Sequence, residues 1–406
     1  MMRRPPGCAT ICRRFDHWLS AWVRMRIGLL GQLLSFQEGY RQAGVSRYIE
    51  NLLRYMPAEL DSSDSLSVFA GAAARHPGRL ATFDRSIDWR WTGWPTGKVP
   101  VRILWEQIAA PFHARNMEID LIHGPVNIVP LITGRPSVVT IHDLAFLEYP
   151  DQYPAMQRRY LTAMTRASTR RADRVITVSQ FTGQDVAERL DVDPDRITAV
   201  PNGVDASFTP RQGSDELHRF RWKNSLPDDF LLFVGTLQPR KNLIGLLRAY
   251  ARLEPDLRVP LYIVGGEGWM YAAIFDEVKR LDIERSVVFA GYAASETLPL
   301  WYSAATACIY PSYYEGFGLP VLEAMACGVP VVTSNRSSLP EVAGDAAILV
   351  DPDDPDDIAQ GISTVLASPE RRQWMQAAGT SQAANYTWQR TARETVAVYR
   401  DVLGDS

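Results

Sequence analysis

The chain has 406 residues, of which 46% are hydrophobic and 22% are charged, and its formal net charge is −3. This length exceeds one ordinary hydrophobic core, so the sequence predicts about two globular domains. The near balance of positive and negative residues removes any whole-molecule electrostatic reason to expect nucleic acid as a partner.

The first 24 residues form a basic segment unlike the rest of the chain. They carry five arginines against a single aspartate, and Arg13, Arg14 and Asp16 interrupt the apolar run before it reaches the length of a signal peptide or a membrane span. Apolar residues from Ile11 to Trp22 fall at helical spacing, which is typical of a basic amphipathic helix on an anionic membrane surface. The interpretation that we favour is a disordered extension. A start of translation at Met25 is a further alternative, because the residues from Met25 onward are typical of the first strand of a domain.

Short apolar runs alternate with amphipathic stretches from residue 25 onward. Between the first two runs, apolar residues repeat every three or four positions from Val45 to Met56, which predicts a helix. Such alternation indicates a parallel sheet covered on both faces. Residues 71–105, rich in Trp, Gly and Pro, are less regular and are predicted to be mainly loop. The predicted strands of this first series are 25–30, 67–70, 120–123, 137–141, 175–179 and 197–201.

A second series of the same kind follows residues 201–213, whose Pro, Gly and Asn content is typical of a linker. The sequence therefore predicts two doubly wound α/β domains. Ligands bind such sheets beyond the carboxyl ends of the strands, so we expect the active site in a cleft between the domains. The predicted strands of the second series are 230–235, 261–266, 287–291, 307–311, 330–334 and 347–350.

Two carboxylates, Glu315 and Glu323, lie in the otherwise apolar segment 310–334. A buried carboxylate needs a partner, and a carboxylate is the usual group that holds the ribose diol of a nucleotide in an α/β domain. Both are predicted to face one ligand. The alternative is that Glu323 only complements the helix dipole and that Glu315 is a solvated loop acid.

The turn between these acids is suited to binding an anion. Pro320 fits the first turn of a helix because it has no N–H to lose. Free N–H groups before and at the helix start would then point outward, and glycines allow close backbone approach. The residues predicted to form this turn are Gly316, Phe317, Gly318 and Leu319.

Residues 233–243 repeat the order of strand, glycine, turn and helix, and they add two adjacent cations, Arg240 and Lys241. Gly235 ends the predicted strand of this segment and Thr236 follows it, and both are predicted to contact the same ligand. Cations are unfavourable at a helix start, which favours an anionic partner over the alternative of a solvated helix end. Two such cations would stabilise a departing phosphate by several kcal/mol, on the order of the effect of an oxyanion hole.

On these motifs, residues 25 to about 400 resemble retaining glycosyltransferases of family 4, which have the two-domain GT-B fold. The resemblance implies that Glu315 contacts the donor sugar and Glu323 the ribose, while Arg240 and Lys241 hold the diphosphate. The matching segments are EGFGLPVLE (315–323), VGTLQPRKN (234–242), VPNGVD (200–205), the run from Phe289 to Pro320 and SSLPEVAGDAAILVDP (337–352).

The first domain offers fewer signals. Residues 42–53 resemble the family's glycine pair near the donor phosphates, but Ala43 replaces the first glycine, so only Gly44 is predicted to bind donor. His142 and Asp143 follow a strand, and the resemblance implies that His142 lies beside the transferred sugar. His123 is a second cleft candidate, on the acceptor side with Asp143. The alternative for a lone histidine is a structural role.

The domain boundaries follow from the same pattern. We expect an acceptor-binding domain over 25–205, a nucleotide-sugar domain over 206–386, and a terminal helix within 387–406 that crosses back onto the first domain. The alternative is that this helix completes the core of the second domain. Acceptor choice is expected to lie in the tryptophan-rich part of 71–105.

Two features that could suggest a metal have simpler explanations. The four cysteines, at positions 8, 12, 308 and 327, lack metal-ligand spacing and are predicted to be buried thiols of a reducing compartment. The acidic run 351–357 contains Pro352 and Pro355, which predicts a turn leading into a helix, where acids are common. We therefore expect no metal, no other cofactor, and a cytoplasmic location, peripheral to the membrane if the basic segment binds it.

The resemblance implies transfer of a hexose from a nucleoside diphosphate with retention, by front-face displacement. The family branch it favours uses GDP-mannose to extend a glycan or lipid-linked saccharide in cell-surface polysaccharide synthesis. A UDP-sugar or a rhamnose donor stays open. The rival functions are a GT-B sugar-nucleotide epimerase and a non-catalytic sugar-nucleotide binder.

Overall fold

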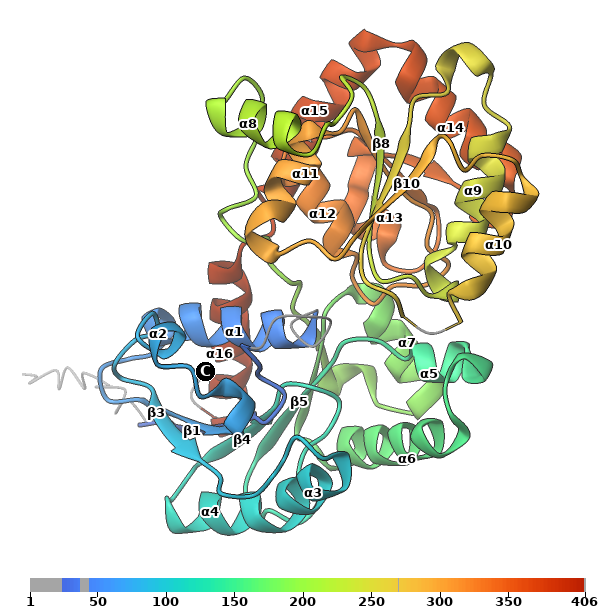
Figure 1. Cartoon of the computed structure of the whole chain (residues 1–406). Helices are drawn as coiled ribbons and strands as arrows, with labels where there is room; N and C mark the ends of the chain where they lie inside the picture. The colour runs from blue at the N-terminus through green and yellow to red at the C-terminus, as the bar shows by residue number, and fades with distance from the viewer. Residues whose placement is uncertain (1–23, 37–43, 269, 405–406) are drawn as a thin grey trace, which may run out of the picture.

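Residues 24–36, 44–268 and 270–404 are described by a computed structural model, in which they form two α/β domains, one above the other in Figure 1. Each domain is built on one parallel sheet with helices packed around it. The predicted fold class of two doubly wound, Rossmann-like domains is confirmed. The basic segment over residues 1–24 lies almost wholly outside the described residues, as does Ala43.

The first sheet has seven parallel strands in the order β3-β2-β1-β4-β5-β6-β7. Six were predicted to within two residues of their ends, whereas β3 was missed because it lies in the segment 71–105 that was predicted to be mainly loop. β3 is a four-residue edge strand with no fully buried side chain, so its apolar pattern is weak. The strands are β1 Arg26–Gly31, β2 Ser65–Ala70, β3 Asp88–Trp91, β4 Leu121–Gly124, β5 Ser137–Ile141, β6 Arg174–Thr177 and β7 Ile197–Ala199.

Helices cover both faces of this sheet, and two of them, α2 and α3, also lie in the segment 71–105. The predicted helix after the first strand is α1, whose buried face includes Tyr48, Ile49, Leu52 and Leu53. The helices are α1 Val45–Tyr55, α2 Pro77–Leu80, α3 Val99–Leu104, the π-helical segment Trp105–Ala109, α4 Ala110–Asn116, α5 Ala145–Glu148, α6 Ala155–Arg171 and α7 Gln180–Leu190.

The second sheet has six parallel strands in the order β10-β9-β8-β11-β12-β13, all predicted to within two residues. The strands are β8 Leu231–Val234, β9 Leu261–Val264, β10 Val287–Gly291, β11 Ala307–Tyr310, β12 Val331–Ser334 and β13 Ile348–Val350. The helices are α8 Asp215–Lys223, α9 Leu243–Ala251, α10 Ala272–Arg280, α11 Leu298–Ala304, α12 Leu319–Ala326, α13 Leu339–Ala343, α14 Pro355–Ala367 and α15 Pro369–Ala383.

Strand order reverses beside β8, which pairs with β9 on one side and with β11 on the other. Helices leave such a point toward opposite faces of the sheet, so a crevice opens at the carboxyl ends of the two strands. The segments that follow β8 and β11 are the two that the sequence analysis assigned to donor binding. The topology therefore brings them together.

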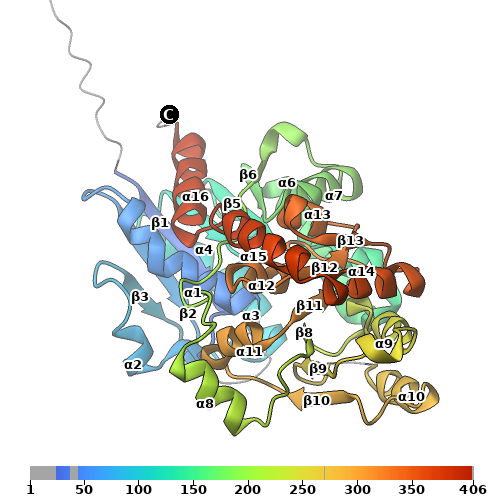
Figure 2. The ribbon, with the colours of Figure 1, turned by 90° about the horizontal axis from the view of Figure 1, so that it is seen from above.

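The chain passes between the domains twice, and the two passages lie side by side. The Val204 N–H donates to the Tyr386 carbonyl at 3.0 Å, and Val204 forms an isolated parallel bridge with Thr387. After the second passage, α16 (Trp388–Leu403) packs against α1 of the first domain, as Figures 1 and 2 show, and contributes to that domain's core. No helix within the described ranges combines the length and apolar character needed to cross a bilayer.

Candidate active site

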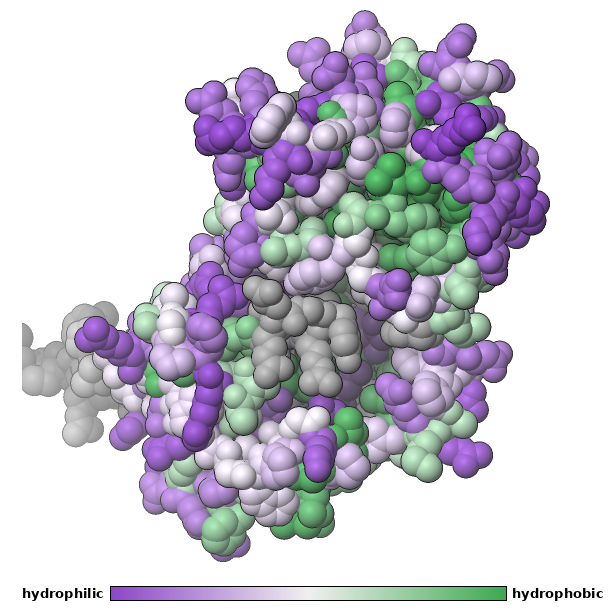
Figure 3. All heavy atoms as spheres, in the orientation of Figure 1, coloured by the Kyte–Doolittle hydropathy of each residue, from purple (hydrophilic) through white to green (hydrophobic). Residues whose placement is uncertain are grey.

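A cavity of about 800 Å³ lies between the two domains. In the space-filling view, the outline of the molecule narrows at the level where the domains meet (Figure 3). The first domain lines the cavity with Gly44, Arg47, His142 and Asp143 among others, and the second with Gly235, Thr236, Arg240, Lys241, Glu315, Gly316, Phe317, Gly318, Leu319 and Glu323 among others. Every predicted site residue except His123 is therefore at one cavity.

The turn after β11 needs its two glycines for different reasons. Gly318 has a φ of 109° and is the N-cap of α12, a left-handed conformation that L side chains rarely adopt. At Gly316 a Cβ atom would lie 1.7 Å from the carbonyl oxygen of His142, so only glycine lets this turn reach the first domain. Pro320 lies in the first turn of α12, as predicted.

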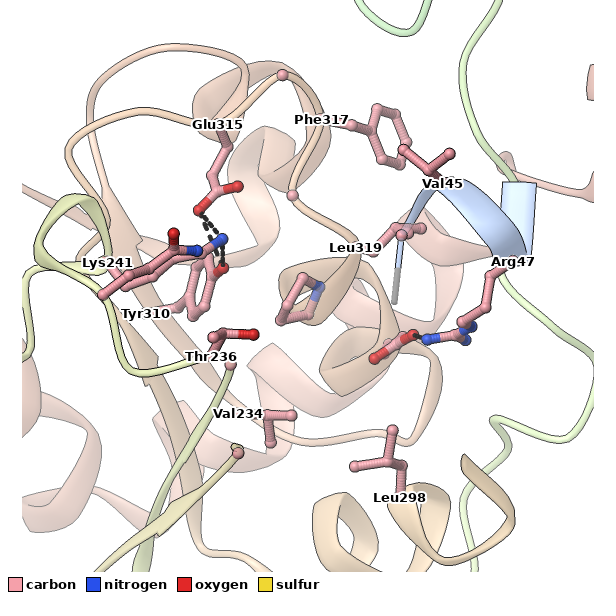
Figure 4. Close-up of a pocket in the computed structure, with 18 of the residues that line it drawn as sticks. Val45, Arg47, Val234, Thr236, Lys241, Leu298, Tyr310, Glu315, Phe317 and Leu319 are labelled. Carbon is pink, nitrogen blue, oxygen red and sulfur yellow. Dashed lines mark hydrogen bonds and ion pairs between the residues drawn. The ribbon is translucent and has the colours of Figure 1, made fainter. Parts of the chain in front are cut away.

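Glu315 is a buried carboxylate surrounded by donors (Figure 4). Lys241 Nζ lies 2.5 Å from its Oε1 and Arg240 Nη1 lies 3.2 Å from its Oε2, while the hydroxyls of Ser312 and Tyr310 donate to Oε1 at 2.7 and 3.0 Å. Burial works against the charge of Glu315, but Lys241 and Arg240 outweigh it and lower the pKa of this carboxyl to about 2. The alternatives of a solvated loop acid and a solvated helix end are wrong, because all three charges are buried together.

Lys241 is the cation of this cluster whose charged form is disfavoured. Burial and then the neighbouring Arg240 lower its pKa to about 8. Arg240 keeps its charge, and its buried Nε has no hydrogen-bond partner among the described residues. A buried donor without a partner is costly, so the cluster has unused capacity for an anion.

Glu323 lies on α12, with its side chain 4% exposed, and has partners from both domains. The Tyr302 hydroxyl donates to its Oε2 at 3.0 Å, and Nη1 of Arg47, from α1 of the first domain, lies 2.8 Å from its Oε1. Figure 4 shows Arg47 at the start of α1. Sequence reasoning missed Arg47. The signal was available, since Arg47 is a cation in the first turn of a predicted helix, the same feature that identified Arg240 and Lys241.

His142 follows β5 and lies at the cavity with Asp143 beside it. Its Nε2 is 2.8 Å from the Pro125 carbonyl, and its ring meets that of Tyr48 edge-on, with 4.7 Å between centroids. Burial lowers the pKa of His142, so the ring is neutral at neutral pH. Because a carbonyl only accepts, Nε2 carries the proton and Nδ1 is left as an acceptor.

His123 does not belong to the site, and its predicted place in the cleft is wrong. The side chain is fully buried, with Nε2 2.8 Å from Thr140 Oγ1 and Nδ1 2.6 Å from the Tyr399 hydroxyl. Burial, with a smaller effect of His142, lowers its pKa to about 3. The reason is register: β4 runs to Gly124, so His123 lies within the strand and faces α16 rather than the cleft.

Hydrogen bonds hold the glycine turn against the first domain. The hydroxyls of Ser179 and Thr182, at the start of α7, donate to the Gly316 carbonyl at 2.6 and 2.9 Å. At the same helix end, the backbone N–H groups of Gln180 and Phe181 donate to the carboxylate of Glu341 from α13. An anion is favourable at this helix end, so the contact stabilises the approach of the two domains.

The acidic run 351–357 is a turn and a helix start, in which the carboxylate of Asp354 accepts a hydrogen bond from the Asp356 N–H. Within the described residues, three or more His, Cys, Asp or Glu side chains do not gather as they would around a metal ion. The positively charged side chains that line the cavity together with its carboxylates are Arg47, Arg240 and Lys241.

Comparison with protein-family models gives two matches that together cover most of the chain. Residues 43–208 match the model described as Glycosyltransferase Family 4, and residues 214–382 match the model described as Glycosyl transferases group 1. Their boundary falls at the first passage between the domains.

Similar proteins agree with these matches. The chain is 33% identical over 363 residues to O-antigen chain mannosyltransferase B of Escherichia coli, covering 89% of this chain and 93% of that protein. It is 30% identical to MMP alpha-(1->4)-mannosyltransferase of Mycolicibacterium hassiacum, over 77% of this chain and 78% of that protein.

Solved structures show the same fold at lower identity. Sucrose-phosphate synthase from Thermosynechococcus elongatus superposes with a TM-score of 0.75 at 22% identity, covering 94% of this chain and 100% of that one. Anabaena Alr3699/HepE, solved in complex with UDP and glucose, superposes with a TM-score of 0.71 at 20% identity, covering 93% and 100%. At this identity the similarity concerns the fold.

Proposed function

Because this chain belongs to glycosyltransferase family 4 and is a glycosyltransferase, we propose that it transfers mannose from GDP-mannose, with retention, to a hydroxyl of a glycan or lipid-linked saccharide in cell-surface polysaccharide synthesis. The mannosyl donor is supported by the similarity to two proteins named as mannosyltransferases. A UDP-sugar is the alternative, and the UDP-glucose complex of the structurally similar Alr3699/HepE keeps it open.

One observation carries the proposal: two buried carboxylates and three buried or half-buried cations line a single cavity at the strand-order switch. In the proposed complex Glu323 accepts hydrogen bonds from the ribose diol, and Glu315 accepts them from hydroxyls of the sugar. Lys241 and Arg240 lie beside Glu315, so a diphosphate next to the sugar would meet both positive charges. The unpartnered Nε of Arg240 supports an anionic ligand there.

The proposed step is a displacement on one face of the sugar. The acceptor oxygen forms a bond to the anomeric carbon on the side from which the donor phosphate leaves, and the leaving phosphate oxygen takes the acceptor proton. Retaining hydrolases use a carboxylate nucleophile instead, whereas the negative charge of Glu315 is already paired with Lys241 and Arg240. Lys241 and Arg240 stabilise the negative charge that builds on the diphosphate, so this step is proposed to need no metal.

His142 is proposed to orient the transferred sugar. Its neutral ring has Nδ1 free to accept a hydrogen bond from a sugar hydroxyl, because Nε2–H is used by the Pro125 carbonyl. Gly44, at the start of α1, is proposed to let the donor phosphates approach the backbone. Its φ of 42° is a left-handed conformation, and a Cβ there would meet no atom within 4 Å.

The test is incubation of the protein with GDP-mannose, UDP-glucose and other nucleotide sugars, with and without lipid-linked acceptors, in the presence and absence of EDTA. We expect GDP-mannose to be consumed only when acceptor is present, to give a product of one added hexose with the donor's anomeric configuration by NMR. Donor consumption without acceptor would instead identify an epimerase, and binding without turnover a sugar-nucleotide binder.

We also propose a cytoplasmic protein that contacts an anionic membrane at its periphery. The basic segment 1–24 lies outside the described residues, but α4 and the π-helical segment before it expose Ile108 (61%) and Phe112 (64%) beside the exposed Arg115. Apolar side chains flanked by cations are typical of helices that lie on anionic bilayers.

Sedimentation with phosphatidylglycerol vesicles, compared with phosphatidylcholine vesicles, tests this contact. The full chain should bind the anionic vesicles, and both the chain starting at Met25 and an Ile108→Ser/Phe112→Ser variant should bind less. Equal binding by the chain starting at Met25 would remove the basic segment from the proposal, and equal binding by the double variant would remove α4.

A further inference from the structure

Arg47 is a cation of the first domain that reaches a carboxylate of the second. It projects from the first turn of α1 into the cavity (Figure 4), where its Nη1 lies 2.8 Å from Oε1 of Glu323. Its guanidinium carbon also lies 5.6 Å from the ring centre of Phe208. The donor-binding residues proposed above do not include it.

This is a costly place for a positive charge. The N-terminal end of a helix carries partial positive charge, and the first turn of α1 has no acidic residue to offset it. The side chain of Arg47 is 23% exposed and that of Glu323 is 4% exposed, so both lose hydration. A buried ion pair gives little net stability over an apolar pair of the same size. Stability alone is therefore a poor reason for this arrangement.

The contact also leaves Glu323 with capacity for a ligand. Its Oε2 accepts the hydrogen bond from Tyr302, whereas its buried Oε1 accepts none among the described residues, because the nearby N–H of Arg47 is not aligned for one. Each carboxylate oxygen has two lone pairs. A hydroxyl of a bound molecule can therefore donate to Oε1 while the charge of Arg47 stays beside it.

The two carboxylates of the cavity differ in where their cations come from. Lys241 and Arg240 belong to the same domain as Glu315, so their contacts with it do not depend on how the domains are arranged. Arg47 belongs to the other domain, so its contact with Glu323 exists only when the domains approach. The state of Glu323 is thereby tied to the closing of the cleft.

We infer that Arg47 is a positioning residue for the nucleotide: when the cleft closes, its guanidinium neutralises Glu323 and sets that carboxylate to accept the ribose diol. The inference rests on the proposed nucleoside-diphosphate donor. Arg47 acts on the ribose through Glu323, so its loss weakens selection for the ribose hydroxyls rather than the chemical step.

Isothermal titration calorimetry with GDP and 2′-deoxy-GDP, and with UDP and 2′-deoxy-UDP, tests the inference. The wild type should bind the ribonucleotide of its own base about tenfold more tightly than the deoxy form, as expected for a hydrogen bond to a charged group. Arg47→Gln and Glu323→Gln should each lose most of this ratio, and the double variant should lose no more than either one. Arg47→Lys should keep part of it.

Arg54→Gln is the matched control, because Arg54 lies on the same helix and pairs with Glu50 at its surface. It should keep the full ratio. In steady-state assays Arg47→Gln should raise the donor KM about tenfold and leave kcat within about twofold. Circular dichroism and thermal unfolding establish that each variant is folded.

The possible failures are distinct. A wild type that does not distinguish the ribonucleotide from its deoxy form would overturn the proposed ribose site and the inference with it. A wild type that does distinguish them, with Arg47→Gln keeping the ratio, would overturn the inference alone. Loss of the ratio in Arg54→Gln as well would show a general effect of charge on α1 and would also overturn it.

Discussion

The charge of each residue at the site depends on two effects, the burial of its side chain and the charges of its neighbours. Glu315 and Lys241 lie 2.5 Å apart in the same cluster, yet the pKa values of both are lowered. At Glu315 the two neighbouring cations outweigh burial, whereas at Lys241 burial and Arg240 together outweigh Glu315. Lys241 therefore loses its charge within the pH range of ordinary assays. Two predictions follow from this residue.

Lys241→Ala should lower kcat about 100-fold, the usual cost of losing one group that stabilises transition-state charge. Its effect on the free energy of unfolding should be only about 1–2 kcal/mol, because Glu315 keeps Arg240 and two hydroxyls as partners. Turnover and thermal unfolding are measured together, with Lys279→Ala on the surface of α10 as the control. Wild-type turnover in Lys241→Ala would contradict the diphosphate assignment.

The pKa of about 8 for Lys241 in the free protein predicts that kcat/KM falls as pH rises through about 8, because kcat/KM reports the ionisation of the free enzyme. In Lys241→Arg this alkaline limb should move upward, because a guanidinium does not lose its proton in this range. Between pH 8 and the ordinary value of 10.5, the unfolded chain holds a proton that the folded chain has released, so this group adds stability as pH rises. Unfolding is followed by fluorescence at each pH, and activity that is lost while the protein stays folded indicates deprotonation rather than denaturation. If the alkaline limb of the pH profile does not move in Lys241→Arg, the limb belongs to another group.

At the scale of elements, the packing of α16 against the first sheet determines the role of His123 in β4. This helix lies against the first sheet and joins it through the hydrogen bond between Tyr399 and His123, 276 residues apart in sequence. His123, which was predicted to lie in the cleft, is therefore part of the buried core. The same helix contributes Trp388, Val396 and Tyr399 to the core that contains α1, which carries Arg47.

Tyr399→Phe should therefore lower the free energy of unfolding by about 1–3 kcal/mol, the cost of leaving a buried polar atom without a partner. The turnover of the folded enzyme should be unchanged, because the Tyr399–His123 pair lies outside the cavity. Urea unfolding and kcat are the measurements, with Tyr55→Phe at the end of α1 as the control. A large fall in kcat with unchanged stability would restore His123 to the acceptor side.

At the scale of the whole molecule, the two passages between the domains form the connection about which they are placed. They approach so closely at Gly203 that a Cβ there would lie 2.2 Å from the Trp388 nitrogen. Across the cleft the domains meet again at the glycine turn, where the hydroxyls of Ser179 and Thr182 donate to the Gly316 carbonyl. The cavity therefore depends on two separate contacts between the domains.

Gly203→Ala should push the passages apart and misplace one half of the site against the other. Because small displacements of reacting groups are costly, kcat/KM should fall about 100-fold while far-UV circular dichroism stays that of the wild type. Gly379→Ala in α15 is the control, since a Cβ at Gly379 would lie no closer than 3.4 Å to its neighbour Met325. Wild-type kinetics in Gly203→Ala would mean that this connection does not set the geometry of the cleft.

Much of the molecule could be predicted because its signals are local. Twelve strands and the glutamate, glycine and cation motifs follow from short apolar runs and fixed spacings. β3 could not be predicted because it is a short edge strand without a buried side chain. The assignment of His123 to the cleft failed because a shift of one residue in a strand's end changes where a side chain points.

The positions of twelve strands along the chain, the two-domain division and the chemical character of the donor segments were thus determined by the sequence itself, since periodicity and backbone preference act over a few residues. Which distant polar side chains meet was decided only by tertiary structure. Arg47 reaches Glu323, and Tyr399 reaches His123, across 276 residues in each case. Such pairs form because domain packing excludes water around them, and an amino-acid sequence has no local pattern for that exclusion.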